Sequence, residues 1–220
     1  MKANVALLQT KWREALAVFA VNEALVDRVF ADLVVRYGEN GRHYHNLQHI
    51  HNVLHTIETL QALATDFTAV QLAAWFHDVI YQVQLAGNVP SNETQSADYA
   101  ATMLSKMNIP AQIVALIHQL ICATQLHSPV PAASDFHILL DADLAILAAD
   151  CGEYDQYAQA IRREYDFVPD AQFRNGRCQV LQSFLDRDQI FLTQPMFQQS
   201  EEAARLNIQR EIDKLRAENV

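Results

Sequence analysis

The chain has 220 residues, half of them hydrophobic, and contains only 5 glycines and 6 prolines. This composition excludes disordered and fibrous classes, and the length is sufficient for one large domain with a substantial core. Lysine and arginine (16) are outnumbered by aspartate and glutamate (26), giving a net charge of −10 that argues against nonspecific binding to nucleic acid or to an anionic membrane. A small anionic substrate is not excluded, because binding one requires only a local cationic site.

The chain offers no signal for secretion or membrane insertion. Its three cysteines, Cys122, Cys151 and Cys178, are widely spaced and lack a Cys-x-x-Cys pair, so neither a disulfide framework nor a thiolate zinc site is indicated. Near the N-terminus, Lys11 and Arg13 interrupt the hydrophobic residues, which excludes a signal peptide or a membrane span there. We therefore expect a protein of the reducing cytoplasm, either a monomer or a homodimer.

Hydrophobic residues recur with a helical period almost throughout, and no strand alternation is persuasive. Asn22 and Asp66 are the predicted N-caps of the second and fourth helices, and Gly38 lies just beyond the second. The predicted helices cover, in chain order, about 5–19, 23–37, 46–64, a fourth that follows Asp66 and carries His77-Asp78, then 93–107, 110–123, 135–149, 154–165, 171–187 and 200–216, with surface loops at 84–92 and 127–133. The sequence therefore predicts an all-α protein, a single domain over residues 1–220 with about nine or ten helices.

The fourth predicted helix carries the most informative feature, the pair His77-Asp78. From residue 69 to residue 81 the only polar side chains, apart from a tyrosine hydroxyl, are Gln71, His77 and Asp78. A helix that is apolar nearly all round is usually buried, and a carboxylate inside one must find a partner. A divalent metal ion would satisfy both the imidazole and the carboxylate. The alternative is a hydrogen-bonded core histidine beside an aspartate that caps a helix or forms a salt bridge.

Helical geometry sorts the histidines that precede this pair. At about 100° per residue, the apolar residues between 50 and 60 define one face of the third predicted helix. His49 lies at the edge of that face, and His45 lies beside it one turn earlier. His51 and His55 point about 200° away from His49 and are expected to be solvated surface residues. His49 is therefore the predicted metal ligand, with His45 placed to work next to the metal.

The same geometry separates two aspartates in the seventh predicted helix. Phe136, Leu139 and Ile146 cluster around the direction of Asp143, whereas Asp141 projects from the opposite side, about 200° away. A carboxylate in an apolar stripe needs a partner, while Asp141 can be hydrated or make a hydrogen bond elsewhere. Asp143 is therefore the predicted ligand and Asp141 the predicted structural residue.

A histidine, a His-Asp pair and a distant aspartate, in this order, resemble the HD-domain superfamily of metal-dependent phosphohydrolases. Tyr44-His45-Asn46-x-x-His49 also resembles the metal-site entry of cyclic-nucleotide phosphodiesterases. The similarity is closer to a bacterial group identified as HD-superfamily phosphohydrolases and covers almost the whole chain. The motifs that carry it are Arg42-His43-Tyr44-His45-Asn46-Leu47-x-His49-Ile50, Trp75-Phe76-His77-Asp78-x-x-Tyr81, Asn92-Glu93-x-x-Ser96-Ala97, Thr124-x-x-His127, Leu140-Asp141-Ala142-Asp143-Leu144-Ala145-Ile146-Leu147, Ile161-Arg162-x-Glu164-Tyr165, Gly176-Arg177 and Glu202-Ala203-x-Arg205-x-Asn207.

The resemblance implies an HD-domain-like helical bundle and a set of site residues. His49, His77, Asp78 and Asp143 correspond to the metal ligands, which would hold one or two divalent ions (Mn, Fe, Zn, Ni or Mg). His45 occupies the place of the phosphodiesterases' general-acid histidine, a role that suits a group titrating near neutral pH. Asp78 would also help to orient the attacking water.

Further residues have two interpretations each. Glu93 and His127 would serve a second metal or the substrate, or else simply a helix N-terminus and a loop surface. His118 flanks an apolar stripe and is expected to be structural. Three arginines would bind phosphate, or else bridge helices through acidic residues: Arg42, Arg162 and Arg177, of which Arg42 is the nearest in sequence to the metal-site helix.

The resemblance implies a metal-dependent hydrolase that cleaves a phosphomonoester, phosphodiester or pyrophosphate bond in a small phosphate ester or nucleotide. Guanosine tetraphosphate hydrolases of this superfamily carry acidic residues shortly after the His-Asp pair, and Val79-Ile80-Tyr81 follows here, so that activity is not expected. One alternative is a di-iron oxygenase, which needs more histidines around the metals and would be favoured if both His118 and His127 were ligands. The other is a non-catalytic module that binds a nucleotide or a metal.

Overall fold

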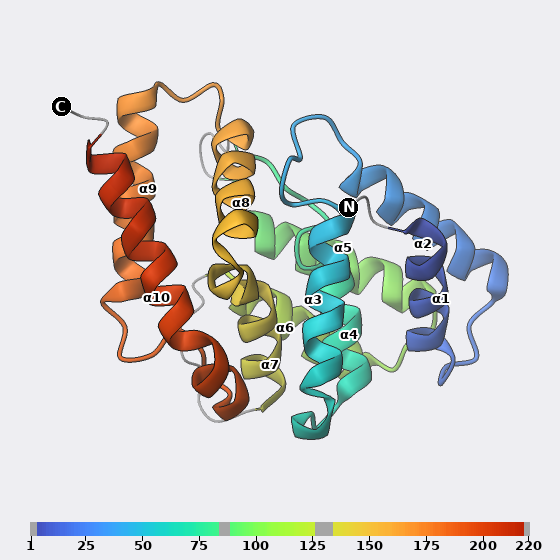
Figure 1. Cartoon of the computed structure of the whole chain (residues 1–220). Coiled ribbons are helices and arrows are strands. Elements are labelled where there is room, and N and C mark those ends of the chain that lie inside the picture. The colour runs from blue at the N-terminus through green and yellow to red at the C-terminus, as the bar shows by residue number, and fades with distance from the viewer. Residues whose placement is uncertain (1–3, 84–88, 126–133, 218–220) are drawn as a thin grey trace.

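The structure, a computed structural model, describes residues 4–83, 89–125 and 134–217, and all regular structure within them is helical (Figure 1). The predicted all-α class and the number of helices are thereby confirmed. The elements are α1 (Val5–Leu16), α2 (Glu23–Tyr37), α3 (Leu47–Thr59), the 3-10 turn η1 (Gln61–Leu63), α4 (Phe67–Phe76), α5 (Asn92–Lys106), α6 (Ala111–Ala123), α7 (Ser134–Leu144), the 3-10 turn η2 (Ala145–Ala148), α8 (Cys151–Glu164), α9 (Asp170–Leu185) and α10 (Gln194–Ala217).

Local capping explains where several helices begin and end. The side chains of Asn22 and Asp66 accept hydrogen bonds from the backbone of the first turns of α2 and α4, and Gly38 is the C-cap of α2, all as predicted. Several predicted boundaries were wrong, two of them by five or six residues. The third helix stops at Thr59 and continues as a 3-10 turn, and the last helix begins at Gln194 rather than at residue 200. Proline is tolerated in a first helical turn, so Pro195 did not delay the start of α10.

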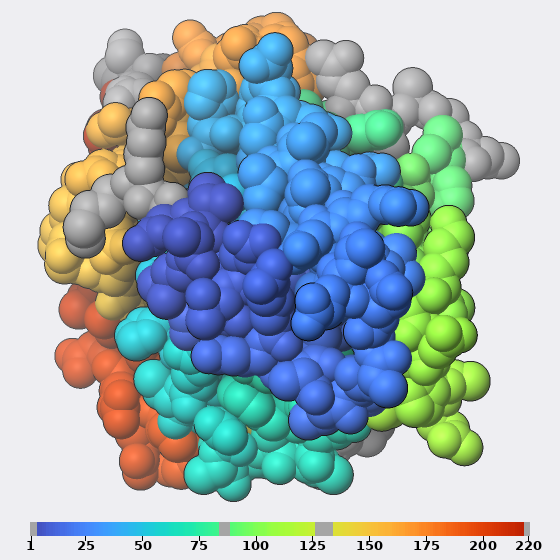
Figure 2. Space-filling view, turned by 90° about the vertical axis from the view of Figure 1, so that its right-hand side faces the viewer, coloured from blue at the N-terminus to red at the C-terminus, as the bar shows by residue number. Residues whose placement is uncertain are grey.

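The centre of the molecule is α4, whose side chains from residue 69 to residue 76 are almost all fully buried. It packs against α3, α5, α6 and α7, and α1 also contacts it. The Trp75 ring meets the Trp12 ring edge to face, with centroids 5.6 Å apart, which joins α4 to α1. Figure 2 shows the face that α1 and α2 (blue) cover, with α5 and α6 (green) along its edge. The apolar character read from the sequence thus places α4, and the residues at its end, inside the molecule.

The C-terminal helices are less deeply embedded. α10 packs on η2 and on α9, and α9 lies at the edge of the molecule beside α10 (Figure 1). Only Leu181 of α9 is buried. Most side chains of α9 are therefore at least partly exposed, and several of them line a cavity.

Some sequence expectations fall outside the described residues, including His127 and most of the two predicted loops. Within the described residues, Cys122, Cys151 and Cys178 are all free thiols. No helix in the same part of the chain combines the length and the apolar character needed to cross a membrane.

Candidate metal centre

Four side chains from three packed elements converge at one point. His49 comes from α3, His77 and Asp78 from the end of α4, and Asp143 from the last turn of α7. One ligand atom of each lies within 4.8 Å of all the others. Because α3, α4 and α7 pack pairwise, the core itself brings these side chains together. The grouping predicted from the sequence is therefore present, and it could hold a metal ion.

The spacing of the donor atoms matches a coordination shell. The Nε2 atoms of His49 and His77 lie 3.0 Å apart. Each Nε2 lies 3.2 Å or 3.4 Å from Oδ2 of Asp78 and from Oδ1 of Asp143. Ligands about 2.1 Å from a common ion lie about 3.0 Å apart at right angles and about 3.4 Å apart at tetrahedral angles. Two imidazole nitrogens and two carboxylate oxygens also suit divalent Mn, Fe, Ni or Zn.

In both His49 and His77, the Nδ1 atom of the ring, which lies away from the other donors, has a hydrogen-bonding partner. His77 Nδ1 lies 2.9 Å from the carbonyl oxygen of Ala74, which can only accept, so this nitrogen carries a proton and Nε2 is the atom that a metal ion would bind in the neutral ring. His49 Nδ1 lies 3.2 Å from the Tyr44 hydroxyl. Metal-binding histidines generally have such a partner, which fixes the orientation of the ring.

His49 and His77 are buried, whereas the side chains of Asp78 and Asp143 are 16% and 14% exposed. Burial would lower the pKa of His77, but the neighbouring Asp78 and Asp143 outweigh burial and raise that pKa well above its ordinary value. Burial would likewise raise the pKa of Asp78, yet His77 and His45 lower it well below its ordinary value. The lowered pKa keeps Asp78 ionised beside the two imidazoles, and a divalent cation bound among these groups would balance its charge.

The position of His77-Asp78 differs from the prediction. The sequence placed the pair inside a helix, but α4 ends at Phe76, so that His77 is the C-cap and Asp78 lies in the turn beyond it. Adjacent side chains on a helix diverge by about 100°, whereas the turn lets both reach the same point. Side chains satisfy the carbonyl groups at the helix end, including that of Trp75, which accepts a hydrogen bond from the Tyr37 hydroxyl.

The guanidinium of Arg42 points into the protein and stabilises this turn. Its guanidinium donates hydrogen bonds to the carbonyl oxygens of His45, Asp78 and Val79, and only 3% of its side chain is exposed. These contacts favour the bridging role that the sequence also allowed for Arg42, and phosphate binding by Arg42 stays a prediction. The Arg42 side chain is long enough to point either toward the cavity or into the protein. Here it points into the protein, because carbonyl groups of the turn lack backbone donors and accept its hydrogen bonds.

Beside the four-residue group, His45 is held by the buried carboxylate of Glu164 at the end of α8. His45 Nδ1 lies 2.6 Å from Glu164 Oε2, and the backbone N–H groups of residues 43–45 all donate to Oε1. The Tyr81 hydroxyl also donates to Oε2, and the Tyr81 ring stacks on the His45 ring with centroids 4.1 Å apart. Burial opposes ionisation, but the bonds from His45 and the backbone prevail and lower the pKa of Glu164 to about 2.

Sequence reasoning assigned no role to Glu164. One signal could have found it, because a carboxylate in the last turn of a helix lies at the unfavourable end of the helix dipole. Glu164 is the last residue of α8 and is 3% exposed, so it needs strong donors from elsewhere. Those donors come from a segment about 120 residues earlier, and no local pattern records that contact.

A cavity of about 710 Å³ extends from the metal group toward α9. Asp143, His45 and Glu93 all line it, although Glu93 is not part of the four-residue group. Arg177 also lines it, but its guanidinium pairs with the Glu211 carboxylate through two hydrogen bonds of 2.8 Å and 3.1 Å. Arg177 is therefore at the predicted site, with its charge already compensated.

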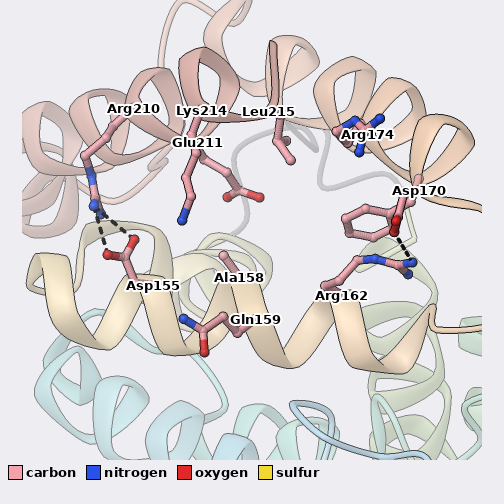
Figure 3. Close-up of a pocket in the computed structure, with 11 residues that line it drawn as sticks. Asp155, Ala158, Gln159, Arg162, Asp170, Arg174, Arg210, Glu211, Lys214 and Leu215 are labelled. Carbon is pink, nitrogen blue, oxygen red and sulfur yellow. Dashed lines mark hydrogen bonds and ion pairs between the residues drawn. The ribbon is translucent and has the colours of Figure 1, made fainter. Parts of the chain in front are cut away.

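A second cavity, of about 310 Å³, lies between α8, α9 and α10 (Figure 3). Arg210 pairs with Asp155 on one side of it, and Arg162 pairs with Asp170 on the other. Arg162 also donates to two carbonyl groups of the connection between α8 and α9, so it is a bridging residue rather than a phosphate ligand. None of the four clustered residues lines this cavity.

Asp141 has the structural role predicted for it. The side chain is fully buried and accepts hydrogen bonds from the backbone N–H groups of Leu192 and Thr193, and from the Thr193 hydroxyl. These contacts hold the segment that leads into α10. Asp141 and Asp143 thus serve different sides of α7.

Four further histidines fall into three environments. His55 is exposed, as predicted, but His51 is half-buried and its Nδ1 atom has no hydrogen-bond partner, so the prediction of a solvated side chain was wrong for His51. His43 is exposed. His118 pairs with Asp98 on the adjacent helix, away from the four-residue group.

Searches of family models, curated proteins and solved structures returned no match to this chain. Any function must therefore follow from the chemistry of the site itself. The resemblance to HD-domain phosphohydrolases remains a prediction from sequence motifs.

Proposed function

We propose that this protein is a metal-dependent hydrolase of a small phosphate ester or nucleotide. The observation that carries the proposal is the adjacency of two devices at one cavity. One is a four-residue donor set for a divalent cation, and the other is an imidazole whose Nδ1 is held by a buried carboxylate. Phosphoryl transfer to water needs both charge neutralisation and a proton donor, and together these residues supply them.

His49, His77, Asp78 and Asp143 would hold the ion. A bound divalent cation supplies Lewis acidity, which withdraws charge from phosphoryl oxygens and makes water acidic enough to attack at neutral pH. The chain contributes a donor set that borders the cavity at Asp143, so that a phosphate in the cavity would lie beside the ion. Asp78, which is 16% exposed at its side chain, would also orient the attacking water.

His45 would act as the general acid. Its Nδ1 is bound to Glu164, so its Nε2 is the nitrogen that can deliver a proton into the cavity that the residue lines. The Glu164 carboxylate pairs directly with the imidazole and holds its Nδ1 side. The stacked Tyr81 ring further restricts the imidazole to one orientation. A positioned acid of this kind contributes about 10²–10⁴-fold to a rate.

Two alternatives are less well supported. A di-iron oxygenase would need His118 and His127 as further ligands, yet His118 pairs with Asp98 and is not part of the group, and His127 lies outside the described residues. A non-catalytic sensor would need the donor set but not a proton donor beside it. The pairing of His45 with Glu164 therefore favours a catalyst over a sensor.

The test is metal analysis of the purified protein, followed by hydrolysis assays on phosphomonoesters, phosphodiesters and nucleoside polyphosphates with added Mn²⁺, Zn²⁺, Ni²⁺, Fe²⁺ or Mg²⁺. We expect bound metal and metal-dependent phosphate release that chelation abolishes and Asp143→Ala removes. Asp141→Ala, a carboxylate from the same helix that faces away from the group, is the matched control and should retain activity. Full metal occupancy with no hydrolysis, or a di-iron absorption band with oxygen consumption, would reject the proposal.

A further inference from the structure

On α6, away from the four-residue group, a thiol and an imidazole lie side by side. His118 and Cys122 are four residues apart, so their side chains share one face of the helix, about one turn apart. Nδ1 of His118 lies 3.7 Å from Sγ of Cys122. Both residues are partly exposed, so an ion from solvent can reach them. The pair contains one cysteine and therefore lacks the Cys-x-x-Cys spacing by which many zinc sites are found in a sequence.

Asp98 of α5 determines which nitrogen of His118 faces the sulfur. Oδ1 of Asp98 lies 3.1 Å from Nε2 of His118. An ionised carboxylate can only accept a hydrogen bond, so in the neutral ring the proton lies on Nε2. Nδ1 then has a free lone pair on the side of Cys122. A carboxylate on the distal nitrogen is a common arrangement for a histidine that binds a metal.

The distance between the two donor atoms fits a shared metal ion. A sulfur about 2.3 Å and a nitrogen about 2.1 Å from a tetrahedral ion lie about 3.6 Å apart, close to the 3.7 Å between Cys122 and His118. The surroundings also suit a cation. Burial, and then the charges of Asp98 and Glu93, raise the pKa of the Cys122 thiol. The negative charges that hold the proton on the sulfur would equally attract a metal ion that replaces it.

We propose that α6 carries a second metal site, in which Sγ of Cys122 and Nδ1 of His118 bind a thiophilic divalent ion of the Zn²⁺ type and Asp98 orients the imidazole. When the ion binds, the thiol proton is released to solvent and water fills the remaining coordination positions. A thiolate selects soft ions, whereas the imidazoles and carboxylates of the four-residue group also suit Mn²⁺. The site is separate from the proposed hydrolase centre and does not depend on that function.

The experiment uses Cd²⁺ as the probe, because a cadmium–thiolate bond absorbs in the ultraviolet. The purified full chain, kept reduced and saturated with Mn²⁺, is titrated with Cd²⁺. We expect a charge-transfer band that saturates at one thiolate-bound Cd²⁺ per chain. Cys122→Ser should abolish the band, and His118→Ala should weaken Cd²⁺ binding by about tenfold or more. Asp98→Ala should weaken it by about 10–100-fold, the usual effect of losing the partner of a metal-binding histidine.

Cys178→Ser is the matched control, because it removes another partly buried thiol, on α9, and should leave the band unchanged. A band that persists in Cys122→Ser, or no band in the wild type, would overturn the proposal. Equal affinity in the wild type and His118→Ala would also overturn it, since the thiol alone would then hold the ion. Thermal melting of each variant excludes misfolding as the cause of lost binding.

Asp143→Ala tests the two metal sites separately in the same titration. It should remove bound Mn²⁺ from the four-residue group and leave the cadmium–thiolate band unchanged. Loss of the band in Asp143→Ala would contradict the independence of the α6 site. Retention of Mn²⁺ in that variant would count against the four-residue group alone, so the two proposals fail in different measurements.

Discussion

Nδ1 of His45 lies 2.6 Å from Oε2 of Glu164, although 119 residues separate the two in the chain. The same carboxylate accepts hydrogen bonds from the backbone N–H groups of residues 43–45, so it positions the segment that leads into α3. A residue on α8 thereby sets the orientation of the imidazole next to the metal group. This contact couples the stability of the fold to the arrangement of the site.

The ionised Glu164 carboxylate should make stability depend on acid pH. Its pKa in the folded protein is about 2, below the ordinary 4.5, so its ionisation stabilises the fold above about pH 4.5. That contribution, on the order of 3 kcal/mol, is lost as the pH falls from about 4.5 to about 2. Urea unfolding of metal-free protein at a series of pH values would measure it. Glu164→Gln should flatten this part of the profile, and an unchanged profile would show that other carboxylates cause the acid loss.

The two aspartates of α7 should separate metal binding from stability. Asp143→Ala removes a donor from the group and should abolish metal binding in metal analysis. Asp141→Ala should keep the metal but lower the free energy of unfolding by on the order of 3 kcal/mol, because it leaves buried donors of Leu192 and Thr193 without an acceptor. The reverse pattern would mean that the roles of the two carboxylates are exchanged. Chelation of the wild type should lower Tm, since the ion binds only the folded chain.

The three histidines of α3 should also differ in their effect on metal binding. His49→Ala removes a buried Nε2 donor and should abolish metal binding, while His51→Ala and His55→Ala should retain it. Equilibrium dialysis against Mn²⁺ would measure all three variants in parallel. His51 is the more demanding control, because it is half-buried and any structural disturbance should appear in its thermal melting. Metal loss in the His51 variant with an unchanged Tm would contradict the assignment.

Replacing His45 should harm turnover far more than metal occupancy. We expect His45→Ala to lower kcat by about 10²–10⁴-fold on a substrate with a poor leaving group while the metal content stays near that of the wild type. A nitrophenyl ester should lose less, since its departing oxygen needs little protonation. Steady-state kinetics on the two kinds of ester would measure the difference. Equal losses on both would identify His45 as a residue that positions the substrate.

Much of the site followed from helical periodicity alone. The angular position of His49 on an apolar face, and of Asp143 against Asp141, could be read from residues a few positions away, because burial of a helix face is a local property of the pattern. The scarcity of polar residues around His77 had the same origin. These local signals were enough to name the four donors that the structure brings together.

Only the tertiary structure decided how those donors are held. The end of α4 at Phe76 depends on Tyr37 and Arg42, which satisfy carbonyl groups at the helix end and in the turn beyond it. Whether Arg42 turned inward or toward a ligand could not be read from its neighbours in sequence, since a long cation can do either. The same holds for Glu164, whose donors lie far away in the chain. Hydrogen bonds between distant segments leave no periodic trace, and these bonds set the geometry of the site.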